Sequence, residues 1–287
     1  MSASPNLAQP AAVPHAKPGM SRMQKLLFFL TAWLICLMPF LFWWNTWFGR
    51  KLSDQQLTEY LHDTKKPRHI QQALVQVGER ITRHDSAAKQ WYPELVILAA
   101  DPVEEVRNTD AWVMGQDTSG VGFHEALLKM LGDPSPMVRG NAALSLVRFG
   151  DATGRPQIAA LLQPAHIVSP ESGRVVDSDR PGTAIHQGGL IAKLLDRNGQ
   201  LVEIRSPIPG RIRSVAGTGA NIAAGAEVAV VDPSTEQVWE ALRALYLIGE
   251  AEDIPAVLPY ERELPDISND VREQATITEW AIRGRMK

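Results

Sequence analysis

The chain has 287 residues, of which 45% are hydrophobic, so it can bury a core in one large domain or two modest ones. Its formal charge of −3 and isoelectric point near 6.2 exclude the basic footprint of a nucleic-acid-binding protein. A single cysteine, Cys36, excludes an intramolecular disulfide and a Cys-x-x-Cys site, and the seven histidines lack zinc-ligand spacing. We therefore predict no nucleic-acid partner and no metal site.

The N-terminal segment has the composition of a tail followed by a membrane anchor. Residues 1–24 are rich in proline, alanine and serine in their first part, which predicts a disordered tail. From Leu26 to Phe48 the chain runs for 23 residues without a charge. As a helix this run would be roughly 34 Å long, enough to cross a hydrocarbon core. We expect a transmembrane helix at residues 25–48 and contact with the membrane from Leu26 to Phe48.

A cleavable signal peptide and a buried core helix are the alternatives for this apolar run. The run is longer than a usual signal core, and no small-residue cleavage motif follows it. Basic residues lie on both sides of the run, so the positive-inside rule does not decide its orientation. A short N-terminal tail favours a single-pass membrane protein whose bulk lies on the extracytoplasmic side of a bacterial inner membrane.

After the apolar run the chain repeats one phrase at an interval of 32 residues. Asp101-Pro102 and Asp133-Pro134 are each followed by Val-Arg and then by alanine. This period is typical of stacked helical hairpins. In the second copy we expect Asp133 to cap a helix that begins near Pro134, an apolar stripe at four-residue spacing, and a helix end at Gly150.

The text of residues 133–151, DPSPMVRGNAALSLVRFGD, resembles HEAT-like repeats, including the short variety named after phycobilisome lyases. The resemblance implies stacked hairpins over residues 52–164 and again over residues 232–287. It also implies ladder residues that connect neighbouring repeats, namely Arg107, Arg139 and Arg272. The expected fold class is mainly α: an α-solenoid of helical hairpins, preceded by one transmembrane helix.

A different kind of structure interrupts the repeat. The phrase Asp133-Pro134-Ser135 returns as Asp232-Pro233-Ser234 at an offset of 99 residues, and removing one 32-residue period leaves 67, the length of residues 165–231. This segment is rich in glycine, valine and isoleucine, and alternating runs at 201–205 and 227–231 predict strands. We expect a small all-β insert in a loop of the helical repeat.

The insert contains a duplication with an offset of 37 residues. SPESGRV at residues 169–175 returns as SPIPGRI at residues 206–212, and Gly182 returns as Gly219. Such a constant offset predicts two equivalent β halves. The two halves resemble the biotinyl/lipoyl-carrier fold, also called the barrel-sandwich hybrid.

In carriers of that fold, a lysine at the tip of the hairpin between the halves is modified by biotin or lipoate. The corresponding tip here consists of Asp196, Arg197, Asn198 and Gly199, and it has no lysine. The nearest lysine, Lys193, is expected in a strand. We therefore expect no modification, no cofactor, no cofactor-binding residue, no catalytic residue and no metal ligand. His186 and His124 are expected at a turn and on a helix surface.

The chain has no Gly-x-Ser-x-Gly, P-loop, dinucleotide-binding or His-Glu-x-x-His motif. The sequence therefore predicts a protein that is not an enzyme: a membrane-anchored scaffold for an unidentified protein partner, with an unmodified lipoyl-like docking module. Membrane fusion proteins of efflux and secretion systems also join an anchor to such a split barrel. An accessory adaptor of an envelope transport complex, with an envelope transporter as partner, is thus an alternative. A bilin lyase-like enzyme is a further one, although the chain has no cysteine outside the predicted membrane segment.

Overall fold

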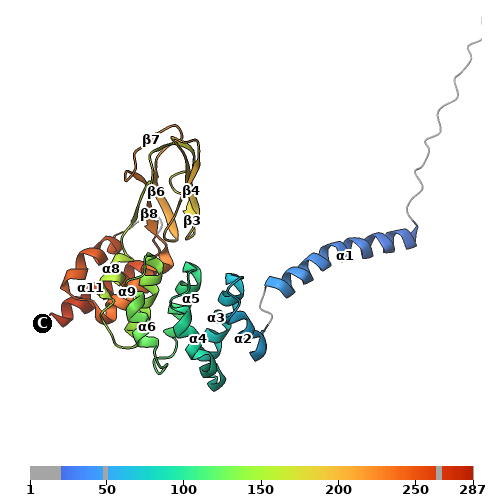
Figure 1. Ribbon diagram of the computed structural model, residues 1–287, viewed down its shortest axis with the longest axis horizontal. Helices are drawn as coiled ribbons and strands as arrows, with labels where there is room; N and C mark the ends of the chain where they lie inside the picture. Colours follow the sequence, from blue (N-terminus) through green and yellow to red (C-terminus); the bar gives the residue numbers. More distant parts are fainter. Residues whose placement is uncertain (1–20, 48–50, 263–266, 287) are drawn as a thin grey trace, which may run out of the picture. The chain divides into compact units, whose positions relative to one another are not determined.

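A computed structural model describes residues 21–47, 51–262 and 267–286 of the chain (Figure 1). The chain separates into two compact units, Met1–Lys51 and Leu52–Lys287. Residues 1–20 of the predicted tail lie outside the described residues. Residues 22–24, the last three of the predicted tail, belong to the first helix.

The first unit contains the helix α1 (Arg22–Trp47). Its first turn carries Arg22 and Lys25. Within the described residues, no helix combines the length and the apolar character that a membrane crossing requires. The predicted transmembrane helix at residues 25–48 and the predicted single-pass membrane location are therefore wrong.

The second unit begins and ends with helices. Before the strands come α2 (Asp54–Leu61), α3 (Pro67–Thr82), η1 (Ser86–Trp91), α4 (Tyr92–Leu98), α5 (Glu104–Met114), α6 (Phe123–Met130), α7 (Pro136–Arg148) and α8 (Arg155–Ala160). After the strands come α9 (Thr235–Ile248), η2 (Ala251–Asp253), α10 (Ile254–Val257), η3 (Leu258–Glu261) and α11 (Asn269–Arg285). Helices α3, α5, α7, α9 and α11 each pack against the next and form one layer, while α4, α6 and α8 pack beside this layer (Figure 1).

Helix α7 shows how the sequence sets the limits of these helices. It begins at Pro136, and its N-cap is Ser135, whose Oγ accepts hydrogen bonds from the backbone N–H groups of Met137 and Val138. The prediction that Asp133 caps a helix from Pro134 is therefore wrong by two residues. Proline still occupies the first helical position, where its missing N–H costs no hydrogen bond.

The buried stripe and the end of α7 agree with the sequence pattern. Val138, Ala142 and Leu146 are fully buried at four-residue spacing. Two residues after the helix, Gly150 has a φ of 74°, a left-handed conformation that a residue with a Cβ rarely adopts. The apolar core of the helices therefore lies between the layer of odd-numbered helices and the helices packed beside it.

Eight strands lie between α8 and α9: β1 (Ala165–Val168), β2 (Gly173–Ser178), β3 (Ala184–Ile185), β4 (Leu190–Asp196), β5 (Leu201–Arg205), β6 (Gly210–Val215), β7 (Asn221–Ile222) and β8 (Glu227–Pro233). They form two four-stranded antiparallel sheets. Sheet A has the order β1-β8-β6-β3, and sheet B has the order β5-β4-β2-β7. We call residues 165–233 the β module.

The predicted 37-residue duplication is confirmed by the strand pairing. Each sheet combines strands from both halves, and the order of sheet B is that of sheet A with every strand replaced by its equivalent. The irregularity between Val175 and Asp177 recurs between Ile212 and Ser214. The two halves are therefore equivalent in register as well as in sequence.

The expected fold class needs correction. The chain is about 53% helical and carries two four-stranded antiparallel sheets, so it is not mainly α with one membrane helix. The physical reason is the exchange of strands between the halves. Because neither half completes a sheet alone, the inserted residues form two full sheets with a common core that contains Val175, Ile191, Ile212 and Val231.

The β module contacts the helices of the second unit at one end. Gln187 Nε2, in the turn between β3 and β4, donates a hydrogen bond to Glu104 Oε1 in the first turn of α5. Met137 of α7 packs against the apolar core of the module, which includes the buried side chain of Ile208. These contacts, together with the chain connections at α8 and α9, hold the module on the helices.

Candidate protein-binding groove

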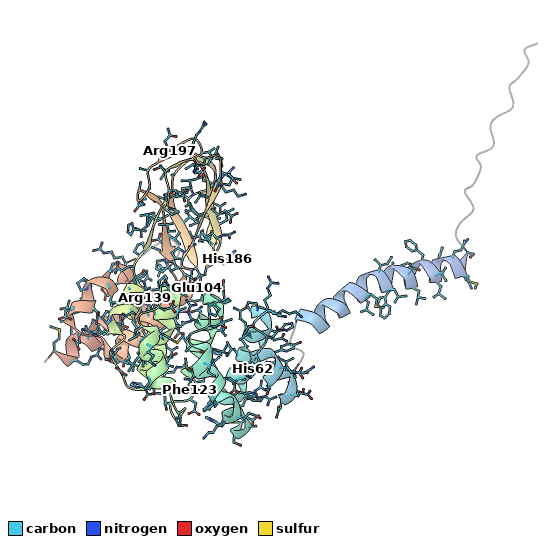
Figure 2. All side chains as sticks on the ribbon, in the orientation of Figure 1. His62, Glu104, Phe123, Arg139, His186 and Arg197 are labelled. Carbon is cyan, nitrogen blue, oxygen red and sulfur yellow. The ribbon has the colours of Figure 1, made fainter. Side chains whose placement is uncertain are left out.

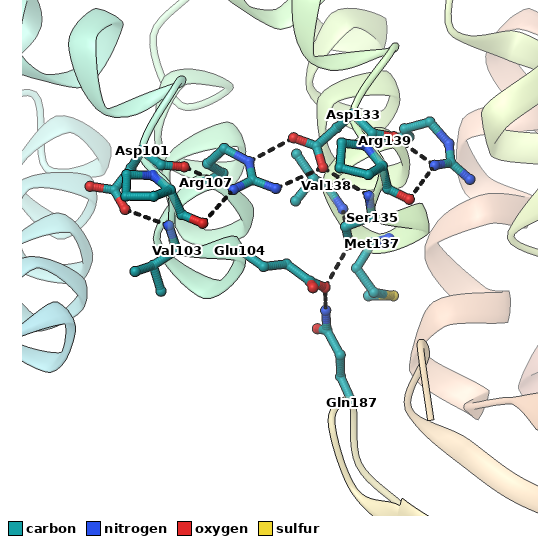
Figure 3. Close-up of polar contacts among 12 residues, drawn as sticks. Asp101, Val103, Glu104, Arg107, Asp133, Ser135, Met137, Val138, Arg139 and Gln187 are labelled. Carbon is teal, nitrogen blue, oxygen red and sulfur yellow. Dashed lines mark hydrogen bonds and ion pairs between the residues drawn. The ribbon is translucent and has the colours of Figure 1, made fainter. Parts of the chain in front are cut away.

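Repeated polar contacts hold α5 and α7 in register (Figure 3). Arg107 of α5 donates from Nε to Asp133 Oδ2 at 2.7 Å and from Nη2 to Asp133 Oδ1 at 3.0 Å. Its Nη1 donates to the carbonyl oxygens of Asp101 and Pro102. Arg107 therefore connects the start of its own repeat with the start of the next one, as the ladder interpretation predicts.

The electrostatics of this contact favour the ionised pair. Burial by itself raises the pKa of Asp133. Hydrogen bonds from Arg107 and from the backbone N–H of Ser135 outweigh burial and hold the pKa of Asp133 below its ordinary value. The two side chains are only 8% and 12% exposed for Asp133 and Arg107, so water screens their attraction weakly.

The other two predicted ladder residues make different contacts. Arg139 donates from Nη1 to the carbonyl oxygens of Asp133 and Pro134, which repeats the intra-repeat half of the Arg107 contacts. In the later Asp-Pro-Ser phrase, Asp232 takes the position of Asp133. Asp232 forms an ion pair with Arg213 of the β module and not with Arg139. Arg272 donates to Asn269 Oδ1 in its own helix. The described contacts therefore show a repeat-to-repeat rung only for Arg107.

A groove of about 710 Å³ crosses the outer face of α5, α7, α9 and α11. Its floor consists of the buried lining residues Ser145, Ala244 and Gln274. Its exposed apolar lining residues are Trp112, Tyr246, Leu247 and Ile277. The volume lies within the range of sites that bind side chains or small ligands.

Hydrogen bonds between neighbouring helices keep the floor of the groove in place. Ser145 Oγ of α7 donates to the carbonyl oxygen of Ala111 at 2.8 Å. In the second pair of helices, Thr278 Oγ1 of α11 donates to the carbonyl oxygen of Leu242 at 3.0 Å. Both hydroxyls are buried, so each bond satisfies a donor that would otherwise be costly to bury.

Several large apolar side chains in and near the groove are exposed. Leu247 is 62% exposed, and Trp280, one turn beyond Ile277 on α11, is 66% exposed. The ring of Trp112 lies over Gly78 of α3, where a Cβ would meet its Cζ3 atom at 2.9 Å. Exposed aromatic and large aliphatic side chains that gather in this way are typical of protein-protein interfaces.

Two guanidinium groups border the groove. Arg148 donates to Gln116 Oε1 at 2.8 Å and to the carbonyl oxygen of Gly115, both neutral acceptors. Arg243 forms a long ion pair of 3.5 Å with Glu240 on the same helix, and both side chains are exposed. Exposed pairs of this kind contribute little, so both arginines can bind carboxylates of a partner.

One acidic side chain of α5 is buried outside the lining of the groove. Asp110 of α5 is completely buried, and neither carboxylate oxygen has a hydrogen-bond partner. Burial, with a further contribution from the charge of Asp101, raises the pKa of Asp110 well above its ordinary value. An ionised carboxylate in such surroundings is costly, so burial favours the neutral form of Asp110.

The hairpin tip that the sequence singles out joins β4 to β5. Asp196 Oδ1 accepts hydrogen bonds from the backbone N–H groups of Asn198 and Gln200, and Gly199 has a φ of 78°. Arg197 lies at the tip, at the end of the module opposite to Glu104 (Figure 2). Lys193 is in β4, paired with Glu203, and not at the tip.

The histidines that the sequence raised have ordinary surroundings. His124 Nε2 lies 2.8 Å from Asp151 Oδ2 and its ring lies against Phe149. His186 lies in the turn before Gln187, near the helices (Figure 2). Within the described residues, no three His, Cys, Asp or Glu side chains gather in a way that could hold a metal ion.

The sequence analysis did not predict the residues that line the groove. Their pattern is visible in retrospect: Trp112, Leu247 and Ile277 are apolar residues outside the buried stripe of their helices. An apolar residue in such a position indicates a second face that requires cover. Sequence spacing could not show that these faces adjoin, because they belong to helices separated by the β module.

Comparison with known families gives one match. Residues 125–152, which include most of α6 and all of α7, match the family model of the HEAT repeat. A comparison with curated proteins finds no match to the chain. The helical part of the chain therefore contains a HEAT repeat at residues 125–152, which supports the resemblance to HEAT-like repeat proteins.

Proposed function

We propose that the chain is a non-catalytic scaffold that binds a partner protein in the groove across α5, α7, α9 and α11. The HEAT repeat at residues 125–152 supports a role in protein interaction. Stacked helical hairpins present extended surfaces of this kind to protein partners. The observation that carries the proposal is the gathering of exposed apolar side chains from three helices around one groove.

The β module acts in this proposal as an unmodified lipoyl-like docking module. Its two equivalent four-stranded sheets support the resemblance to a barrel-sandwich hybrid. The hairpin tip with Arg197 supports the absence of a modification, because arginine cannot form the amide that biotin or lipoate requires. Mass spectrometry of the native protein tests this part, and a biotinyl or lipoyl adduct on Lys193 would refute it.

Crosslinking capture with matched variants tests the groove. A double substitution, Leu247→Asp with Ile277→Asp, places two carboxylates on the exposed apolar lining without changing the buried core. The matched control is Ile97→Asp on α4, because Ile97 is 72% exposed and lies outside the groove. Proteins captured by the wild type and by the control, but not by the groove variant, are the expected result.

The same capture can contradict the proposal. If the groove variant retains every protein that the control retains, the groove does not bind the partner. The thermal unfolding of each variant must be compared first, since a variant that has lost its fold would lose partners for a trivial reason. Substitutions at exposed sites usually change stability by less than about 0.5 kcal/mol, so both variants should fold.

A further inference from the structure

Helix α11 carries a row of exposed residues along one side. The helix packs against α9 and η3 and lies at the end of the layer of odd-numbered helices (Figure 1). Its residues on the packed side are buried, namely Val271, Gln274, Ala275, Thr278 and Ile282. On the opposite side the exposed residues are Glu273, Ile277, Trp280 and Gly284. Spacings of three and four residues place side chains in one row along a helix, and we call this row the α11 stripe.

The middle of the α11 stripe is apolar. Trp280 is 66% exposed and Ile277 is 43% exposed, and the two side chains are neighbours on the helix surface. Gly284 follows one turn later and adds no side chain, and a Cβ at this position would meet no atom within 4 Å. A helix surface without a side chain allows a second helix to approach closely. An exposed tryptophan beside such a surface is typical of the residues that interfaces bury.

The two ends of the α11 stripe carry opposite charges. At its start, the exposed carboxylate of Glu273 has no hydrogen bond or ion pair within the described residues. At its other end, Arg283 lies next to Gly284 and its side chain is 55% exposed. Arg283 uses its Nε to bind Glu279 on the same helix, so its Nη groups can donate to a further carboxylate. The stripe therefore has an acidic end, an apolar middle and a basic end.

This order of charges makes the α11 stripe complementary to itself in one direction only. In an antiparallel pair of two such helices, Glu273 of one copy meets Gly284 and Arg283 of the other, and Trp280 meets Ile277. The pairs 273 with 284 and 277 with 280 are both symmetric about the same point of the helix, so one register satisfies both. A parallel pair would place Glu273 beside Glu273 and Arg283 beside Arg283, which is repulsive. Antiparallel helices also oppose their dipoles favourably.

We propose that the α11 stripe binds the α11 stripe of a second copy of this chain, antiparallel and around a two-fold axis. The charge complementarity selects this occupant, because the acidic end, the apolar middle and the basic end all find their counterparts in one register. Such an interface is isologous, so each contact occurs twice. The two ion pairs between Glu273 and Arg283 border the two contacts between Trp280 and Ile277.

The inference goes beyond the proposed function and does not rest on it. Ile277 belongs to both surfaces, because it also lines the groove across α5, α7, α9 and α11. Glu273, Trp280, Arg283 and Gly284 are outside the lining of the groove. Substitutions at these four positions therefore test the α11 stripe and leave the lining of the groove unchanged.

A disulfide between two copies reads the register directly. One full-length chain carries Glu273→Cys and another carries Gly284→Cys, and both carry Cys36→Ala, so each chain has one thiol. The two chains are mixed in a glutathione redox buffer, and intact mass distinguishes the mixed disulfide from the two like-with-like disulfides. The proposed register brings the thiols of the mixed pair together. It keeps the thiols of two Glu273→Cys chains roughly 16 Å apart along the helix axis, too far for a disulfide.

Two further substitutions, each introduced into both chains, test the contacts. Trp280→Gln removes the ring and keeps a good helix former, and its matched control is Ile97→Gln, because Ile97 is 72% exposed on α4. Arg283→Gln removes the charge at the basic end, and its matched control is Arg262→Gln, because Arg262 is also exposed and lies outside α11. Circular dichroism checks that every variant melts within about 3 °C of the parent chain.

The mixed disulfide should form about tenfold or more faster than the disulfide between two Glu273→Cys chains. Its rate should fall about tenfold with Trp280→Gln and about threefold with Arg283→Gln, and stay within about twofold with either control. Equal rates for the mixed and the Glu273→Cys pairs would overturn the inference, as would the absence of any disulfide. A mixed disulfide that forms equally fast with Trp280→Gln would also overturn it, because another part of the chain would then hold the copies together. None of these results decides whether the groove binds a partner, which the capture with Leu247→Asp/Ile277→Asp tests.

Discussion

Arg107 of one helical repeat holds Asp133 of the next repeat through two hydrogen bonds, from Nε to Oδ2 at 2.7 Å and from Nη2 to Oδ1 at 3.0 Å. The same carboxylate accepts the backbone N–H of Ser135, the N-cap of α7. A single buried acid thus connects two repeats and orders the residue that starts a helix. Stacked repeats depend on such contacts because each repeat meets only its neighbours.

Removing the charge of Asp133 should destabilise the protein. Asp133→Asn keeps one oxygen but leaves the guanidinium of Arg107 without an anionic partner in a nearly buried place. We expect a loss of about 2–4 kcal/mol in the free energy of unfolding, measured by chemical denaturation. The matched control is Glu79→Gln, which breaks an ion pair with Arg83 whose side chains are 51% and 64% exposed, and it should cost less than about 0.5 kcal/mol.

The contribution of Asp133 should also depend on pH in a defined direction. Its pKa is lower in the folded protein than the ordinary value of 3.8. Its stabilisation is therefore complete above the unfolded pKa and is lost as the pH falls through the folded pKa. Denaturation curves of wild type and Asp133→Asn should converge below about pH 4. A constant difference down to the lowest pH would show that the charge is not the cause.

Asp110 should show the opposite dependence. Burial raises its pKa, so folding favours the protonated form, and the stability of the wild type falls as the pH rises above the unfolded pKa of 3.8. Asp110→Asn keeps the shape and removes the ionisation. The variant should gain stability relative to the wild type as the pH is raised from about 4 to about 8. A pH-independent difference between the two proteins would contradict this account of the side chain.

Glu104 should control how firmly the β module is held. Its Oε1 accepts hydrogen bonds from Gln187 Nε2 in the module and from Ser135 Oγ at the N-cap of α7 (Figure 3). In Glu104→Ala, the amide hydrogens of residues 186–189 should exchange faster with deuterium. The neighbouring Glu105→Ala is the control, because no contact of its exposed carboxylate is described. Equal exchange in the two variants would mean that the module does not depend on this contact.

Tyr260 should contribute through a buried hydrogen bond. Its hydroxyl donates to the carbonyl oxygen of Leu162 at 2.6 Å, and burial raises its pKa to about 12. Tyr260→Phe should cost about 1 kcal/mol in the free energy of unfolding near neutral pH. For an acid with a raised pKa, this contribution is present below the unfolded value near 10 and is lost as the pH rises towards 12. A spectrophotometric titration that finds Tyr260 ionised near pH 10 would contradict it.

Local patterns account for the parts of the fold that could be predicted. The 32-residue phrase indicated helical repeats, and the 37-residue offset indicated a duplicated β module, because buried stripes, turn glycines and strand alternation are properties of short segments. The start of α7 was misplaced by two residues, because Asp133 binds Arg107 instead of capping the helix. That choice depends on a residue in another repeat.

The apolar run near the N-terminus is a local pattern that led to a wrong prediction. Twenty-three uncharged residues from Leu26 to Phe48 suggested a membrane helix, whereas no helix of the described chain is long and apolar enough to cross a membrane. The groove likewise had no counterpart in the sequence interpretation. Its lining residues come from helices on both sides of the β module, and only packing brings them together.

The sequence by itself determined that the chain repeats, where the repeat stops and that the inserted halves are equivalent, because periodicity is a local property. The tertiary structure alone decided which of the two equivalent sheets lies beside the helices. The chain enters and leaves the module through β1 and β8 of sheet A, so Arg211 and Asp232 of that sheet line a cavity that helical segments also line. The duplicated sequence makes the two faces alike in register, and the points of attachment make them different in surroundings.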